Sequence, residues 1–179
     1  LIRKLERNEL VMQDAYIVAY GRSAIGKGKG NGALANHRPD DIAAEVLKGV
    51  IDRVDGDFDP ALIEDVIVGC AFPEGIQGMN FARTIALRAG LPYSVAGQTV
   101  HKMSSSVLQT TATATDDRMA EHSDIVVAGG VEFMSSVPMG GNEVTNNPTL
   151  QAEDSGVSYP MGLTAENVAT KYNVTREDQ

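Results

Sequence analysis

Three consecutive serines, Ser104, Ser105 and Ser106, lie where a predicted strand passes into a predicted helix, within the segment TVHKMSSSVLQ. The first turn of a helix has backbone N–H groups without partners and carries a partial positive charge. Such a turn stabilises a nucleophile that becomes negatively charged, or an oxyanion that forms beside it. Serine is also a common N-cap, and from the residues alone that structural role is the more frequent explanation.

Few other residues could attack a substrate or hold a metal ion. Cys70 is the only cysteine, which excludes an intrachain disulfide and a cysteine metal cluster. It lies in an apolar stretch, where we expect a packed and inert thiol. His37, His101 and His122 have no spacing that is typical of a metal site. We therefore predict neither a metal ion nor a bound cofactor.

Apolar runs and helical periodicities alternate along the chain up to the 130s. Four short runs are predicted strands: AYIVAY at residues 15–20, DVIVGCAF, SVAGQTV and DIVVAGG, of which we expect all but the third to be buried. Helical spacing follows Asp40, which we expect to cap its helix, and recurs in NFARTIALR, ended by Gly90, and over about residues 104–121. This alternation predicts a layered α/β fold with a largely parallel sheet flanked by helices.

Two other stretches are loop-like. Residues 21–39 are rich in glycine and basic residues, but they contain no phosphate-binding motif, and we expect a solvated loop. From residue 131 onward the chain is again loop-like, until GLTAENVATKYNV predicts a helix with Thr164 as its cap. Thr175 and Asp178 then form a capping-box pattern that announces a further helix. We interpret the chain as the N-terminal fragment of a longer protein.

Composition limits the classes of function. The 179 residues carry a net charge of -9 and no basic run, which argues against nucleic-acid binding. No apolar stretch approaches the roughly 20 residues that span a bilayer, so we predict no membrane span and expect a cytoplasmic protein.

Several blocks of the sequence resemble the thiolase family, in the order and spacing of that family. They are DVIVGCAFPEGIQGMNFAR, RAGLP, TVHKMSSSVLQ, DIVVAGGVEFMSSVPMGG and YPMGLTAENVATKYNVTREDQ, preceded by YIVAYGRSAIGK. The resemblance implies a thiolase-like layered fold whose N-terminal half has a mostly parallel mixed sheet flanked by helices. It also implies a domain division: an extension at residues 1–13, the thiolase N-terminal α/β domain at 14–143, and the truncated start of the loop domain at 144–179.

The resemblance implies a chemistry too. Thiolases are acyltransferases that cleave or form 3-ketoacyl-CoA, with CoA thioesters as substrates and no further cofactor, and they are homodimers or tetramers. Their nucleophilic cysteine falls on Ser104, while His101, Lys102 and Val107 replace the family's asparagine, arginine and glycine. Met161 matches a loop that borders the acyl pocket, although plain packing explains it equally well. The family's other catalytic groups, a histidine, a second cysteine and an asparagine segment, have no counterpart in this chain.

Three hypotheses follow from these departures. The first is an acyltransferase fragment, inactive or strongly impaired because serine stands at the nucleophile position. The second is a non-catalytic thiolase-like protein that binds acyl-CoA or a partner subunit. The third, less supported, is a condensing-enzyme relative with altered chemistry such as decarboxylation. We also expect that a half without its partner half exposes an apolar helix face and self-associates.

Overall fold

The computed structural model describes residues 13–179, which fall into two compact units. The first unit ends at Asn142 and the second spans Glu143–Gln179, and each is described by itself. The expected extension at residues 1–13 lies outside the described residues, apart from Gln13. The division into an α/β domain and the start of a loop domain remains a prediction.

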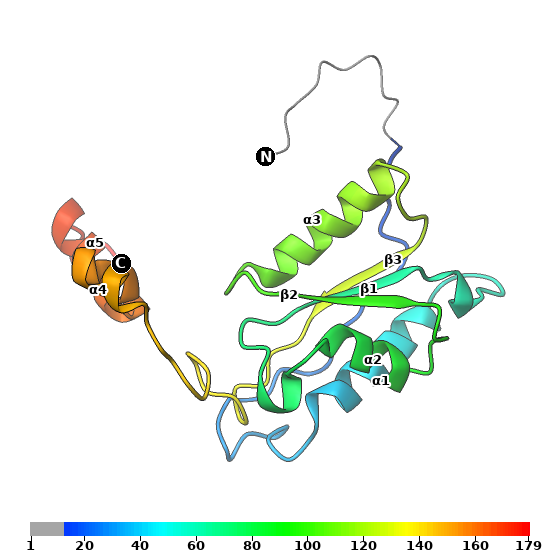
Figure 1. The fold of residues 1–179 in the computed structure, drawn as a ribbon, viewed down its shortest axis with the longest axis horizontal. Coiled ribbons are helices and arrows are strands. Elements are labelled where there is room, and N and C mark those ends of the chain that lie inside the picture. The colour runs from blue at the N-terminus through cyan, green and yellow to red at the C-terminus, as the bar shows by residue number, and fades with distance from the viewer. Residues whose placement is uncertain (1–12) are drawn as a thin grey trace. The chain divides into compact units, whose positions relative to one another are not determined.

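The first unit is built on a three-stranded parallel sheet. Its strands are β1 (Asp65–Gly69), β2 (Ala96–Val100) and β3 (Val126–Gly130), in the spatial order β2-β1-β3 (Figure 1). The register pairs Gly69 with Val100 on one side and with Gly130 on the other, so the three strands end level at one edge. The expected α/β class with a largely parallel sheet is confirmed.

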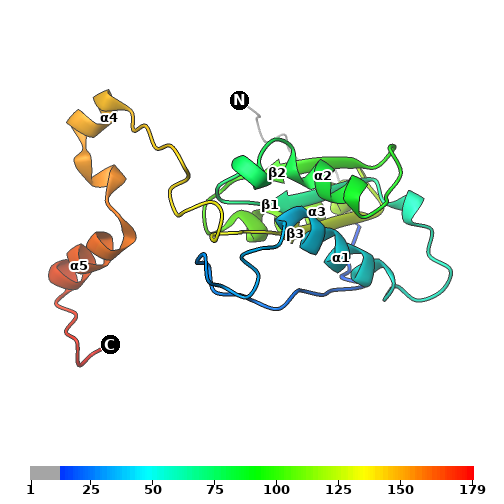
Figure 2. The same cartoon turned by 90° about the horizontal axis from the view of Figure 1, so that it is seen from below.

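Helices cover both faces of this sheet. The helices α1 (Pro39–Ile51) and α2 (Phe81–Arg88) lie on one side and α3 (Ser106–Met119) lies on the other (Figures 1 and 2). Successive side chains of β1 point to opposite faces. Val66 and Val68 join the core under α1 and α2, whereas Gly69 faces the start of α3. Three layers are therefore formed around one central, buried strand.

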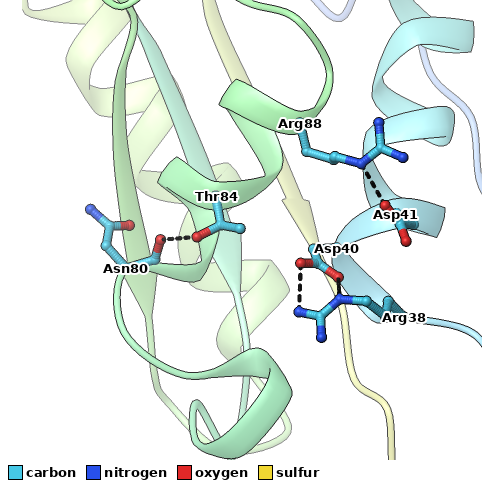
Figure 3. A network of polar contacts seen from close by, with 6 residues as sticks. All are labelled: Arg38, Asp40, Asp41, Asn80, Thr84 and Arg88. Carbon is cyan, nitrogen blue, oxygen red and sulfur yellow. Dashed lines mark hydrogen bonds and ion pairs between the residues drawn. The ribbon is translucent and has the colours of Figure 1, made fainter.

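Both ends of α2 have a local cause in the sequence. The side chain of Asn80 accepts a hydrogen bond from the backbone N–H of Arg83 at 3.2 Å, and the Thr84 hydroxyl donates to the Asn80 carbonyl at 3.4 Å (Figure 3). Gly90 follows the helix with φ of +86°, a left-handed conformation that glycine adopts without a Cβ penalty. The prediction that Gly90 ends this helix is confirmed.

The cap predicted for α1 is wrong. The helix begins at Pro39, one residue before Asp40, because proline at the first helical position already has a helical φ. Asp40 instead binds the Arg38 guanidinium through two hydrogen bonds of 2.9 Å, and Asp41 pairs with Arg88 of α2 (Figure 3). The two carboxylates therefore connect the start of α1 to the residue that precedes it and to the neighbouring helix α2.

The Arg38–Asp40 pair predicts a pH-dependent stability. Burial opposes ionisation of Asp40, but the hydrogen bonds and charge of Arg38 outweigh it, so the pKa of this carboxyl lies below its ordinary value of 3.8. Because the folded pKa is lowered, the stabilisation is complete above pH 3.8 and is lost as the pH falls through the folded pKa. We expect Asp40→Asn to lower the free energy of unfolding at pH 7 by about 1 kcal/mol or less, because solvent around the half-exposed Arg38 side chain screens the pair. In urea unfolding, that difference from the parent should shrink toward pH 3; a constant difference would contradict the role given to Arg38.

Two strand expectations require correction. Residues 15–20 form no strand, and their apolar side chains are exposed, Ile17 by 82% and Val18 by 77%. A strand needs a neighbour that accepts its hydrogen bonds, and no described strand pairs with this segment. The strand β3 was expected to be buried but is only half-buried, because it is an edge strand whose single described neighbour is β1.

The second unit is helical. It contains α4 (Pro148–Glu153), a short 3₁₀ turn at Ser155–Ser158, and α5 (Met161–Tyr172). The sequence analysis missed α4. Thr164 lies inside α5 rather than at its cap, and its hydroxyl donates to the Pro160 carbonyl at 3.3 Å. No described helix is long and apolar enough to cross a membrane.

The capping-box contacts predicted at the C-terminal end are present. The backbone N–H of Thr175 donates to the Asp178 carboxylate at 2.8 Å, and the backbone N–H of Asp178 donates to the Thr175 hydroxyl at 3.2 Å. The first of these hydrogen bonds lowers the pKa of Asp178 below its ordinary value. The reciprocal arrangement satisfies two backbone donors at once.

Candidate functional site: the turn from β2 into α3

Ser104 is exposed in the turn that joins β2 to α3. The strand ends at Val100 and the helix begins at Ser106, with Ser105 at the N-cap position. The Ser105 hydroxyl makes no capping bond but donates backward to the Lys102 carbonyl at 2.9 Å. The capping explanation of this serine run therefore fails for Ser105, and Ser104 lies two residues before the first residue of α3.

The turn itself is tightly closed. Met103 has φ of +46°, a left-handed conformation that is rare for a residue with a long side chain. The backbone N–H groups of Ser105 and Ser106 donate to the carbonyls of Lys102 and Met103, both at 3.1 Å. These contacts hold Ser104 between the strand and the helix.

Two glycines let α3 approach the end of the sheet. A Cβ on Gly69, the last residue of β1, would lie 2.7 Å from the carbonyl carbon of Ser106 and 2.9 Å from the backbone nitrogen of Val107. A Cβ on Gly130, the last residue of β3, would overlap the Val107 side chain. The start of α3 thus lies directly on the carboxyl ends of two strands. In parallel sheets, this edge is where ligands generally bind.

The groups around Ser104 do not include a base bound to its hydroxyl. His101, which is close in sequence, makes no hydrogen bond with Ser104 in the part of the chain that the structure describes. The Lys102 ammonium donates to the side-chain oxygen of Gln109 at 2.6 Å, so it lies along the first turns of α3. The local charge is positive and favours an anion at this turn.

A second polar cluster lies at the same edge of the sheet and was missed by the sequence analysis. The Gln77 side chain is fully buried; it donates to the Glu132 carboxylate at 2.7 Å and accepts from the backbone N–H of Phe133 at 3.0 Å. Glu132 also accepts from the backbone N–H of Ala71 at 2.6 Å. These bonds tie the segments that follow β1 and β3 to each other. Nothing in the residue pattern pairs a glutamine with a glutamate 55 positions away.

Cys70 is next to this cluster and is packed in the interior, as the sequence predicts. Its side chain is buried, and burial together with the nearby Glu132 carboxylate raises the pKa of the thiol to about 12. A thiol with so high a pKa is almost entirely protonated at neutral pH, and the thiolate is the reactive form. Cys70 is therefore not a candidate nucleophile.

Met161 is the first residue of α5, in the second unit, and its side chain is 75% exposed. Its assignment to an acyl pocket remains a prediction. Within residues 13–179, no group of three or more histidine, cysteine, aspartate or glutamate side chains is placed to hold a metal ion.

Comparison with known proteins identifies the family. The model of the thiolase N-terminal domain matches residues 15–179. The chain is 45% identical over 168 residues to the 3-ketoacyl-CoA thiolase of Bacillus subtilis (strain 168), covering 94% of this chain and 42% of that protein. It is 40% identical over 165 residues to the 3-ketoacyl-CoA thiolase of Saccharophagus degradans, covering 92% and 41%. The chain spans about two-fifths of the length of these relatives. The match extends over nearly all of its residues, and the chain belongs to the thiolase family.

Proposed function

We propose that this chain is the N-terminal part of an acyl-CoA acyltransferase that cleaves or forms 3-ketoacyl-CoA, with Ser104 at the position of the nucleophile. The observation that carries the proposal is the exposure of Ser104 at the turn into α3, on the carboxyl edge of the parallel sheet. The names of the relatives support the substrate class, since those proteins are 3-ketoacyl-CoA thiolases.

The reaction needs a nucleophile that becomes an anion. The attacking atom adds to the 3-keto carbonyl, and the negative charge of the resulting oxyanion is stabilised by nearby N–H donors. The bond between C2 and C3 then breaks, the acyl group stays on the nucleophile, and the released acyl-CoA carbanion takes a proton at C2. In the second step the thiol of CoA attacks the bound acyl group and frees the nucleophile.

Serine makes the first step difficult. A thiol at a helix N-terminus is readily ionised near neutral pH, whereas a serine hydroxyl needs an adjacent general base. No hydrogen bond joins Ser104 to such a base among the described residues. The activity of the chain as it stands is therefore absent or strongly impaired.

A second candidate function is binding without catalysis. Its specific support is Val107, a branched residue in the first turn of α3 where thiolases have glycine, whose side chain covers Gly130 beside the site. A protein that holds acyl-CoA or a partner subunit needs the fold but not the nucleophile. Assembly as a homodimer or tetramer and a cytoplasmic location belong to both versions of the proposal, whereas a reaction without metal or further cofactor belongs to the first.

Acylation of the chain separates the two versions. The parent chain and Ser104→Cys are incubated with acetoacetyl-CoA, and the acyl group is detected by intact mass and located by peptide mapping. We expect an acetyl group on the substituted position in Ser104→Cys and none in the parent. Acylation at another residue, or no acylation of Ser104→Cys while acetoacetyl-CoA binds, would contradict the acyltransferase proposal and favour a binding role.

A further inference from the structure

We propose that Ser106 is a positioning residue: its hydroxyl locks the turn that holds residue 104 at the start of α3. The inference rests on the proposed function, because it concerns the same turn. It assigns Ser106 no contact with substrate. Its role is to hold the backbone on either side of the nucleophile position in one conformation.

The first support is the hydrogen bonding of Ser106. Its hydroxyl accepts from the backbone N–H of Lys102 at 3.0 Å and donates to the Met103 carbonyl at 2.5 Å. The two partners immediately precede Ser104, and Ser106 follows it by two residues. One side chain therefore closes the turn around Ser104, using both the donor and the acceptor capacity of its hydroxyl.

The second support is burial and lack of space. Ser106 is 4% exposed, whereas Ser104 and Ser105 on the same turn are exposed. A Cβ on Gly69 would lie 2.9 Å from the Ser106 Cβ, so β1 lies against this side chain. The hydroxyl therefore has little freedom to leave its partners. Without it, the Lys102 N–H would lose its acceptor in a partly buried place, which is costly.

The third support is the conformation of Met103. A positive φ is unfavourable for a non-glycine residue and persists only where the surrounding contacts impose it. The Ser106 hydroxyl bonds the backbone N–H of Lys102, the residue before Met103, and the carbonyl of Met103, so it is placed to impose that conformation. If the turn relaxes, residue 104 changes its position relative to the start of α3, whose partial positive charge favours an anion.

The chain offers a clean probe of this effect. In Ser104→Cys, the introduced thiol occupies an exposed position, whereas Cys70 is buried with a pKa raised to about 12, and we expect it not to react with iodoacetamide. Alkylation joins sulfur to carbon and releases iodide, and its rate follows the thiolate fraction. The pH midpoint of the rate thus reports the pKa of the thiol at position 104, and we expect it below the ordinary value of about 8.5.

The test compares three variants in this background. Ser106→Ala should raise the midpoint by about one pH unit and slow alkylation at pH 7 about tenfold. Thr110→Ala is the matched control. It also removes a buried hydroxyl of α3, bonded to the carbonyls of Val107 and Gly129, but it does not touch residues 102–104. It should lower stability and leave the midpoint unchanged. If Ser106→Ala alone does not fold, the same comparison is made in a chain that also carries Met103→Gly. That second substitution removes the cost of the positive φ, so that the loss of the Ser106 hydroxyl can still be measured.

The outcomes distinguish this inference from the proposed function. An ordinary midpoint in Ser104→Cys itself would overturn both, because position 104 would then not sense the start of α3. A lowered midpoint that Ser106→Ala leaves in place would overturn the inference alone. An equal rise in Ser106→Ala and Thr110→Ala would also overturn it, because the effect would then be one of general stability.

Discussion

Replacing Gly69 by alanine is expected to destabilise the chain by about 3 kcal/mol, the upper end of what overpacking a core usually costs. The added Cβ would lie 2.7 Å from the Ser106 carbonyl carbon and 2.9 Å from the Val107 nitrogen, and both are backbone atoms of α3. A flexible side chain can move away from such a contact, but a helix backbone can move only by lifting from the sheet. The free energy of unfolding in urea, followed by circular dichroism, measures the loss.

Gly129→Ala is the matched control for this prediction. Gly129 lies in β3, in register with Val68, so it is one residue away from the level of Gly69. A Cβ at Gly129 would meet no atom within 4 Å. We expect a change of about 0.5 kcal/mol or less. If the two alanine variants were equally stable, the start of α3 would not pack closely against Gly69. The geometry proposed for Ser104 would then be wrong as well.

The sequence predicts the sheet and its helices well because burial is periodic. The central strand is a continuous apolar run, and apolar residues of α1 and α2 recur at helical spacing. The layered α/β class therefore follows from a single amino-acid sequence. The same reasoning fails for residues 15–20. Their apolar composition indicates a strand, but pairing depends on a neighbour, and composition carries no information about which strands are adjacent.

Some of the predicted helix ends are confirmed by the structure and others are wrong. Gly90 was assigned correctly because its left-handed conformation is a property of one residue. Asp40 was wrongly predicted as the cap of α1, because the helix begins one position earlier, at Pro39. The Asp40 carboxylate instead accepts hydrogen bonds from the Arg38 guanidinium. The helix α4 begins with Asn147 as cap and proline at the first helical position, a signal that was present and was overlooked.

The resemblance to thiolases predicts Ser104 as the position of the nucleophile, whereas the serine run by itself favours helix capping. The hydrogen bonds and packing that build this turn were not predictable. The packing of Ser106 against Gly69 and the hydrogen bond between Gln77 and Glu132 join segments that are far apart in sequence. Such contacts arise from tertiary packing, so periodicity and spacing cannot reveal them.

The largest effect on activity is expected from the single substitution Ser104→Cys in a complete protein. Thiolate formation is accessible near neutral pH and alkoxide formation is not, and an ester is a poorer acyl donor than a thioester. Together these differences should cost more than about 4 kcal/mol of barrier, which is roughly a thousandfold in rate at 1.36 kcal/mol per decade.

The most direct measurement uses a hybrid in which this chain replaces the matching part of the Bacillus subtilis 3-ketoacyl-CoA thiolase. Thiolysis of acetoacetyl-CoA by CoA is followed for the hybrid with Ser104 and for the same hybrid with Ser104→Cys, after both are shown to be folded. We predict that the Ser104→Cys hybrid is faster by about a thousandfold or more. Equal rates in the two folded hybrids, whether high or absent, would contradict the claim that residue 104 occupies the nucleophile position.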